Sequence, residues 1–119
     1  MPKLLIIDDE KENAFYLEGF FKKRGCQVTT SFTGEDGLAS FEKSKPDIVL
    51  LDIKLPGING LEVLKRMREK DKKTPVVIYT GYGDDSIRKQ AEELGANNYI
   101  ERPFNMPQLE GVLAKLIHK

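Results

Sequence analysis

The chain has 119 residues, enough for one domain with its own hydrophobic core. Its 19 Lys and Arg residues balance 19 Asp and Glu residues, so no net charge attracts nucleic acid or an anionic membrane. The single cysteine, Cys26, excludes an internal disulfide and a cysteine-based metal site. We therefore expect one soluble, cytoplasmic domain over residues 1–119, with no nucleic-acid or membrane partner.

The first third of the chain has two strand patterns around one helix pattern. Residues 4–7 are continuously apolar, as in a parallel strand that is covered on both faces. Residues 11–24 carry apolar side chains at three-and-four spacing, and Gly25 follows where helices often end. Residues 26–30 alternate in polarity, which predicts an edge strand with Cys26 as a small core residue.

The middle third has clear helix starts. Residues 33–36 resemble a capping box and predict a helix that ends before Pro46. Residues 48–51 are again continuously apolar and predict a buried strand. Asn59 and Glu62 have the spacing of an N-cap residue and its N3 partner, which predicts a third helix.

The last third continues the alternation. Residues 76–79 and, more weakly, 98–100 predict strands. Helix patterns run from about 84 to 94 and from about 106 to 117. Five strand-helix units in succession predict a three-layer α/β fold with a parallel sheet.

Acidic residues follow two of the predicted strands. Asp8, Asp9 and Glu10 come after the first, and Asp52 comes after the third. Ligands bind beside the carboxyl ends of strands in open parallel sheets. Two carboxylates about 4 Å apart repel by about 1–4 kcal/mol, so either a pKa rises or a cation binds. An all-oxygen site suits Mg²⁺. Capping of the first helix by Asp8 or Asp9 is an alternative, but it leaves Asp52 without an explanation.

Groups that suit a phosphoryl oxygen follow the other strands. Thr80 offers a hydroxyl and Gly81 an unshielded backbone N–H, although Thr80 is also an ordinary strand residue. Arg102 places a cation at the end of the fifth strand, facing the acidic cluster. With Asp52 as nucleophile, these are the groups that phosphoryl transfer requires.

Five segments together resemble the receiver domain of two-component response regulators, over residues 3 to about 117. The segments are residues 6–10, 49–52, 55–60, 79–83 and 99–104. The resemblance implies a doubly wound (βα)5 sandwich with a parallel sheet in the order 2-1-3-4-5. It also implies a stand-alone signalling domain whose only chemistry is its own phosphorylation and dephosphorylation.

The resemblance implies a role for each acidic residue. Asp52 would accept a phosphoryl group from a histidine kinase or a histidine phosphotransfer protein. Asp9 and Asp52 would hold Mg²⁺, or alternatively Mn²⁺, directly. The backbone carbonyl of Lys54 would be a third protein ligand, and Asp8 would act largely through water.

The resemblance also implies a switch. Thr80 would move toward the acyl phosphate and Tyr99 would follow it inward. This would change the surface of the fourth helix, fifth strand and fifth helix, to which a downstream protein target would bind. The chain itself would be a monomer or a weak dimer. Lys54 and Tyr82 would tune dephosphorylation, although the Lys54 side chain equally suits a plain exposed loop.

Arg102 departs from the family pattern, which has lysine before this proline. Arginine is longer and planar, so the alternative is a degenerate receiver that binds partners without phosphorylation. The retained Asp52 and Thr80 argue against that alternative. Docking of a partner is expected at the side chains around the site opening, unless Tyr16 lies flat on the scaffold. These docking candidates are Asn13, Tyr16, Pro103 and Phe104.

Overall fold

Five strands and five helices alternate along the part of the chain that the structure describes, as predicted. The structure is a computed structural model and describes residues 2–81, 84–101 and 105–117. The elements are β1 (Lys3–Ile7), α1 (Lys11–Lys22), β2 (Gln27–Ser31), α2 (Gly34–Ser44), β3 (Ile48–Leu51), α3 (Gly60–Lys70), β4 (Val76–Thr80), α4 (Asp85–Glu93), β5 (Asn98–Glu101) and α5 (Met106–Ile117). Within the described ranges, no helix has the length and apolar character needed to cross a bilayer.

All five strands form one parallel sheet in the order β2-β1-β3-β4-β5. This confirms the predicted doubly wound (βα)5 architecture. Ile7 of β1 lies opposite Leu51 of β3, and Leu51 lies opposite Ile78 of β4. Asp8 and Asp52, which directly follow β1 and β3, therefore leave the sheet at the same height along one edge, while β4 extends two residues beyond Ile78 to Thr80.

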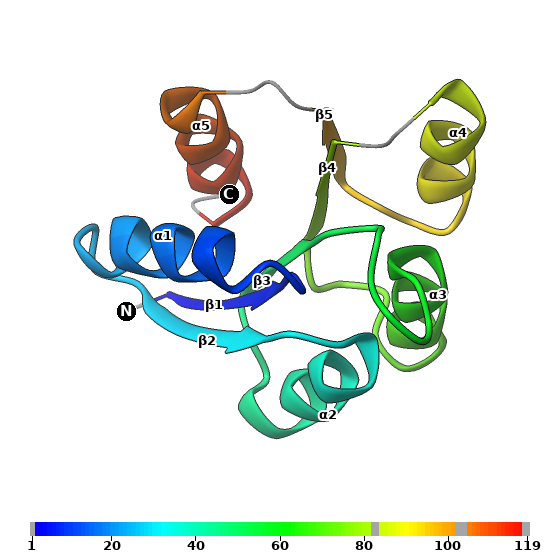
Figure 1. Cartoon of the computed structure of the whole chain (residues 1–119), viewed down its shortest axis with the longest axis horizontal. Helices are drawn as coiled ribbons and strands as arrows, with labels where there is room; N and C mark the ends of the chain where they lie inside the picture. The colour runs from blue at the N-terminus through cyan, green and yellow to red at the C-terminus, as the bar shows by residue number, and fades with distance from the viewer. Residues whose placement is uncertain (1, 82–83, 102–104, 118–119) are drawn as a thin grey trace.

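Helices cover both faces of the sheet (Figure 1). Helices α1 and α5 lie on one face, and α2, α3 and α4 lie on the other. Side chains alternate between the faces, so Leu4 and Ile6 pack toward α1 and α5 while Leu5 and Ile7 pack toward α2 and α3. This double covering is the reason that the central strands are continuously apolar.

The predicted helix starts are confirmed in atomic detail. The Thr33 hydroxyl accepts a hydrogen bond from the Asp36 N–H at 3.0 Å, at the start of α2. The Asn59 side-chain oxygen accepts one from the Glu62 N–H at 3.0 Å, at the start of α3. Each bond satisfies one of the N–H groups that the first turn of a helix leaves without a partner.

The end of α1 differs from the prediction. The helix ends at Lys22 rather than at residue 24, and Gly25 then takes a positive φ of 88°. The strand β2 begins at Gln27, so half-buried Cys26 precedes it and packs against the core on the α1 side. The four residues between α1 and β2 form this reversal, because the chain must turn back before it can pair with β1.

One arginine joins α3 to the loop between α4 and β5. The Arg68 guanidinium donates to the Gly95 carbonyl from Nε at 3.1 Å and from Nη2 at 2.9 Å. It also donates to the Asn97 side-chain oxygen at 3.0 Å and to the Asp71 carbonyl at 3.1 Å. Two segments that lie apart in the sequence, the end of α3 and the loop before β5, are thus held by one side chain.

Arg68→Ala is expected to lower the free energy of unfolding by about 2 kcal/mol, because several charge-assisted hydrogen bonds are lost together. Arg66→Ala is the matched control, since Arg66 pairs with Glu62 one helical turn away, at 2.9 Å. Such an exposed pair contributes about 0.5 kcal/mol. Urea unfolding of both variants checks this, and equal losses would contradict a special role for Arg68.

Candidate functional site

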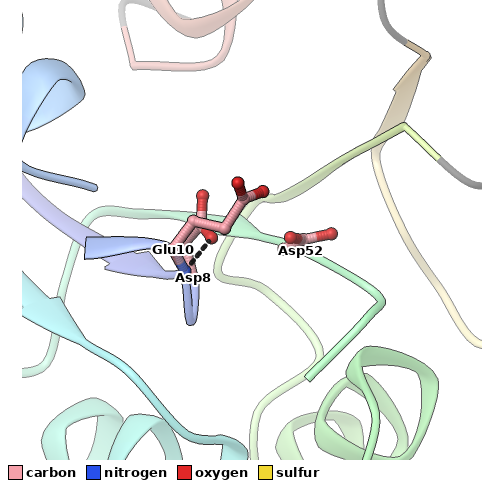
Figure 2. A group of neighbouring side chains, drawn as sticks. All are labelled: Asp8, Glu10 and Asp52. Atoms are coloured by element: carbon pink, nitrogen blue, oxygen red, sulfur yellow. Dashed lines mark hydrogen bonds between the residues drawn. The ribbon is translucent and has the colours of Figure 1, made fainter. Parts of the chain in front are cut away.

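Three carboxylates gather at the carboxyl ends of β1 and β3. Asp8, Glu10 and Asp52 each offer an oxygen, and these oxygens all lie within 4.8 Å of one another. In Figure 2, the Asp8 and Glu10 side chains come from the loop after β1, and the Asp52 carboxylate extends into the space beside them. Carboxylates held this close repel one another, so the site favours a cation.

Asp8 is fully buried, and its carboxylate accepts three hydrogen bonds from residues that the structure describes. Its Oδ1 accepts from the Glu10 N–H at 2.9 Å. Its Oδ2 accepts from the Asn13 amide at 2.6 Å and from the Tyr79 hydroxyl at 2.6 Å. Asp8 therefore shapes the loop that leads into α1, while the N-cap position of that helix is Glu10, whose side chain makes no capping bond.

Asp52 lies at the end of β3 with 5% of its surface exposed. Its N–H donates to the Ile7 carbonyl at 3.0 Å, and its Oδ1 accepts from the Lys54 N–H at 3.3 Å. The first residue of α3, Gly60, lies against this segment. A Cβ at Gly60 would come within 2.3 Å of the Asp52 carbonyl oxygen. The absence of a side chain at residue 60 thus allows α3 to start directly beside the carboxylate.

Thr80 and Tyr99 lie on the neighbouring strands. Thr80 ends β4, is buried, and lies opposite Glu101 of β5, while Gly81 is exposed. The hydroxyl of Tyr99 is buried and has no hydrogen-bond partner among the described residues. Burial is the main reason that the pKa of Tyr99 is raised. The Arg88 guanidinium lies 4.9 Å from the centre of the Tyr99 ring and also pairs with Glu101 at 3.3 Å.

The carboxylates that meet differ in one member from those that the sequence suggested as metal ligands. Asp8 and Asp52 come together, and the third carboxylate of this group is Glu10 rather than Asp9, although both of these residues are exposed. Glu10 belongs to the same acidic run as Asp8 and Asp9, and this run was the feature of the sequence that could have identified it as a site residue. The direction of each side chain in such a run depends on the backbone of the loop, which the sequence pattern does not specify.

The remaining predicted residues divide into two groups. The Asn13 amide donates to Asp8, the Tyr16 side chain is 60% exposed, and the Lys54 side chain is exposed. The other predicted residues lie outside the described part of the chain; they are Tyr82, Arg102, Pro103 and Phe104. Two residues without a predicted role at the site also contribute to it, namely Tyr79 and Gly60.

The donor set fits Mg²⁺. All the donors in the cluster are carboxylate oxygens, which hard divalent cations prefer. A cation of two positive charges would offset the repulsion among Asp8, Glu10 and Asp52. The cluster also lies at the edge of a parallel sheet where ligands of this fold class bind.

Comparisons with known proteins agree with this geometry. The family model described as the response regulator receiver domain matches residues 4–114. Sporulation initiation phosphotransferase F of Bacillus subtilis is 36% identical over 97% of this chain and 93% of that protein. Transcriptional regulatory protein AfsQ1 of Streptomyces coelicolor is 38% identical over 100% of this chain, which spans 52% of that protein's length. A two-component response regulator from Clostridium difficile superimposes with a TM-score of 0.95 at 25% identity, covering 100% of this chain and 98% of that one.

The family match extends over nearly the whole described fold, and the parallel sheet carries the acidic pocket at its carboxyl edge. Receiver domains of this family are signalling domains that bind Mg²⁺ at a cluster of acidic residues and interact with histidine kinases or phosphotransfer proteins. The retained cluster does not support the degenerate alternative. The chain belongs to the response regulator receiver domain family.

Proposed function

We propose that Asp52 is the residue of this receiver domain that accepts the phosphoryl group, from a phosphohistidine on a histidine kinase or a histidine phosphotransfer protein. The observation that carries this proposal is a nearly buried carboxylate at the end of a central strand, within an acidic cluster. A buried, immobilised carboxylate is oriented before the donor arrives, which lowers the entropic cost of the reaction.

In the proposed reaction, one carboxylate oxygen of Asp52 attacks the phosphorus atom and forms a P–O bond. The P–N bond to the donor imidazole breaks, and the nitrogen keeps the electron pair and takes a proton. A bound Mg²⁺ would offset the negative charge of the phosphoryl oxygens. Asp8, Asp52 and either Glu10 or Asp9 would hold this ion together with the Lys54 backbone carbonyl.

Residues at the ends of the fourth and fifth strands would make the other contacts to the phosphoryl group. The Thr80 hydroxyl and the Gly81 N–H would donate to phosphoryl oxygens, and Arg102 would provide the counter-cation. Lys54 and Tyr82 would tune hydrolysis of the acyl phosphate. Partner docking would use Asn13 and Tyr16 of α1 together with Pro103 and Phe104.

The proposed switch couples Thr80 to Tyr99. The buried Tyr99 hydroxyl and the Arg88 side chain over its ring describe one position of this aromatic. A movement of Thr80 toward the acyl phosphate would open space for Tyr99 and alter the surface of α4, β5 and α5. A downstream protein in the cytoplasm would bind that surface, and the receiver chain would be a monomer or a weak dimer.

Tyr99→Phe is expected to raise the free energy of unfolding of the unphosphorylated chain by about 1 kcal/mol. The hydroxyl is buried and has no hydrogen-bond partner among the residues that the structure describes, so its removal relieves a desolvation cost. Tyr16→Phe is the control, because Tyr16 is 60% exposed and its hydroxyl reaches water. Chemical unfolding of both variants measures the difference. A loss of stability in Tyr99→Phe would contradict this account of the hydroxyl.

The proposed function is tested by incubating the chain with acetyl phosphate and Mg²⁺ and measuring its intact mass. We expect one added phosphoryl group, absent when a chelator removes the metal. Reduction of the acyl phosphate with borohydride followed by peptide mapping should place the group on Asp52. No adduct under any condition, or an adduct on another residue, would overturn the assignment of Asp52.

A further inference from the structure

A tyrosine lies in the core directly beneath the acidic cluster. Tyr79 is fully buried in β4, in a segment that is otherwise aliphatic until Thr80. Its ring belongs to the core on the α1 and α5 face of the sheet, with Leu50 and Val77. A phenol hydroxyl in such a core is costly unless it finds a hydrogen-bond partner.

The partner is a carboxylate of the functional site. The Tyr79 hydroxyl donates to Asp8 Oδ2 at 2.6 Å, a short bond of the charge-assisted kind. The strand order places β3 between β1 and β4, so this bond reaches across the strand that carries Asp52. Ile7 pairs with Leu51, and Leu51 pairs with Ile78. Asp8, Asp52 and Tyr79 each come directly after one of these three residues, which explains why the three side chains lie near one another.

The bond limits how Asp8 can turn. Oδ2 receives the Tyr79 hydroxyl and the Asn13 amide, and Oδ1 receives the Glu10 N–H. A carboxylate has about four acceptor positions, so donors within the described ranges already use three of them. The plane of the Asp8 carboxylate is therefore set by donors from β4, from α1 and from its own loop.

We propose that Tyr79 is a positioning residue for the phosphoryl-transfer site, which orients Asp8 so that the carboxylate cluster binds Mg²⁺. This inference rests on the proposed function of the cluster. It adds a residue of the central sheet that touches neither the cation nor the phosphoryl group and acts through Asp8. Groups that orient a metal ligand in this way commonly contribute about 10-fold to 100-fold in metal affinity.

Tyr79→Phe removes one oxygen atom and keeps the ring that packs in the core. We expect the Mg²⁺ dissociation constant, measured by calorimetric titration, to rise about 10-fold. Phosphorylation by acetyl phosphate should slow at low Mg²⁺ and recover at saturating Mg²⁺. Such recovery would not follow from a purely structural defect, because added metal does not restore a lost core contact.

Val77→Ala is the matched control. Val77 lies two residues earlier on the same strand and face, and it is fully buried without a side-chain hydrogen bond to lose. This variant should be less stable in urea yet bind Mg²⁺ within about 2-fold of the parent chain, since no donor to the cluster is removed. If Tyr79→Phe fails to fold, Asn13→Ala removes the other donor to the same Asp8 oxygen and should weaken Mg²⁺ binding in the same direction.

The outcomes separate the two proposals. A parent chain that binds Mg²⁺ and accepts a phosphoryl group, with Tyr79→Phe unchanged in Mg²⁺ affinity, would overturn the role of Tyr79 alone. Equal weakening in Tyr79→Phe and Val77→Ala would do the same, because the effect would then follow stability. A parent chain that takes no phosphoryl group would overturn the proposed function itself.

Discussion

Asp52→Asn is expected to abolish phosphorylation of the chain. The amide oxygen of asparagine is a poor nucleophile, and attack by it would not give an acyl phosphate. The substitution also removes one of the three carboxylates of the cluster, which weakens Mg²⁺ binding. Intact-mass measurement with acetyl phosphate and Mg²⁺ should show no adduct, where the parent chain gains one phosphoryl group.

The control for Asp52→Asn is the same change at an exposed aspartate outside the cluster. Asp36 lies in the first turn of α2 and is exposed, so Asp36→Asn should be phosphorylated like the parent chain. An adduct of parental yield on Asp52→Asn would mean that another residue is the acceptor.

Asp52→Asn should also change stability in a metal-dependent way. Without Mg²⁺, the loss of one of several neighbouring carboxylates relieves repulsion of about 1 kcal/mol or more. The variant should therefore unfold at a higher urea concentration than the parent chain in chelator. Added Mg²⁺ should stabilise the parent chain more than the variant, because only the parent chain has the full cluster. An equal response to Mg²⁺ would place the metal elsewhere.

Gly60→Ala is expected to lower the free energy of unfolding by about 3 kcal/mol and to disturb the site. A Cβ at residue 60 would lie 2.3 Å from the Asp52 carbonyl oxygen and 2.6 Å from the Ile53 Cα. Both neighbours are backbone atoms, so neither can move aside by a change of rotamer. The start of α3 must shift away from Asp52, and overpacking of this kind costs about 1–3 kcal/mol before the hydrogen bond from Gly60 to Ile53 is counted.

Gly19→Ala makes the same chemical change and should have the opposite effect. Gly19 lies inside α1, and apart from the backbone of its own helix no described atom lies within 4 Å of an added Cβ. Alanine there should raise the free energy of unfolding by about 0.5–1 kcal/mol, because glycine is a poor helix former. Urea unfolding measures the change in the free energy of unfolding for both variants. The phosphorylation rate with acetyl phosphate should fall in Gly60→Ala and stay unchanged in Gly19→Ala. A neutral Gly60→Ala would show that α3 tolerates the shift.

The pairing of a buried phenol with a buried carboxylate explains why the acidic cluster is compatible with a stable fold. Asp8 is fully buried, and a buried carboxylate without donors would destabilise the protein by several kcal/mol. Its three donors come from separate parts of the chain: the loop after β1, helix α1 and strand β4. The core of the α1 and α5 face and the functional site are therefore joined at one side chain.

The sequence by itself was sufficient for the fold and for the approximate location of the site. Continuous apolar runs located β1, β3 and β4, because a strand that is covered on both faces has no polar side. The side-chain caps of Thr33 and Asn59 located two helix starts, because capping depends only on neighbours within one turn. Asp52 was recognisable because a carboxylate at the end of such a strand has no role in the core.

The tertiary structure decided which side chains meet. It brought Glu10 rather than Asp9 to the group with Asp8 and Asp52, since loop backbone sets the direction of each side chain. It also gave Tyr79 its partner 71 residues earlier in the chain and placed Gly60 against Asp52. These contacts depend on strand order and register, which arise from packing of the whole sheet between its helices and leave no local pattern in the sequence.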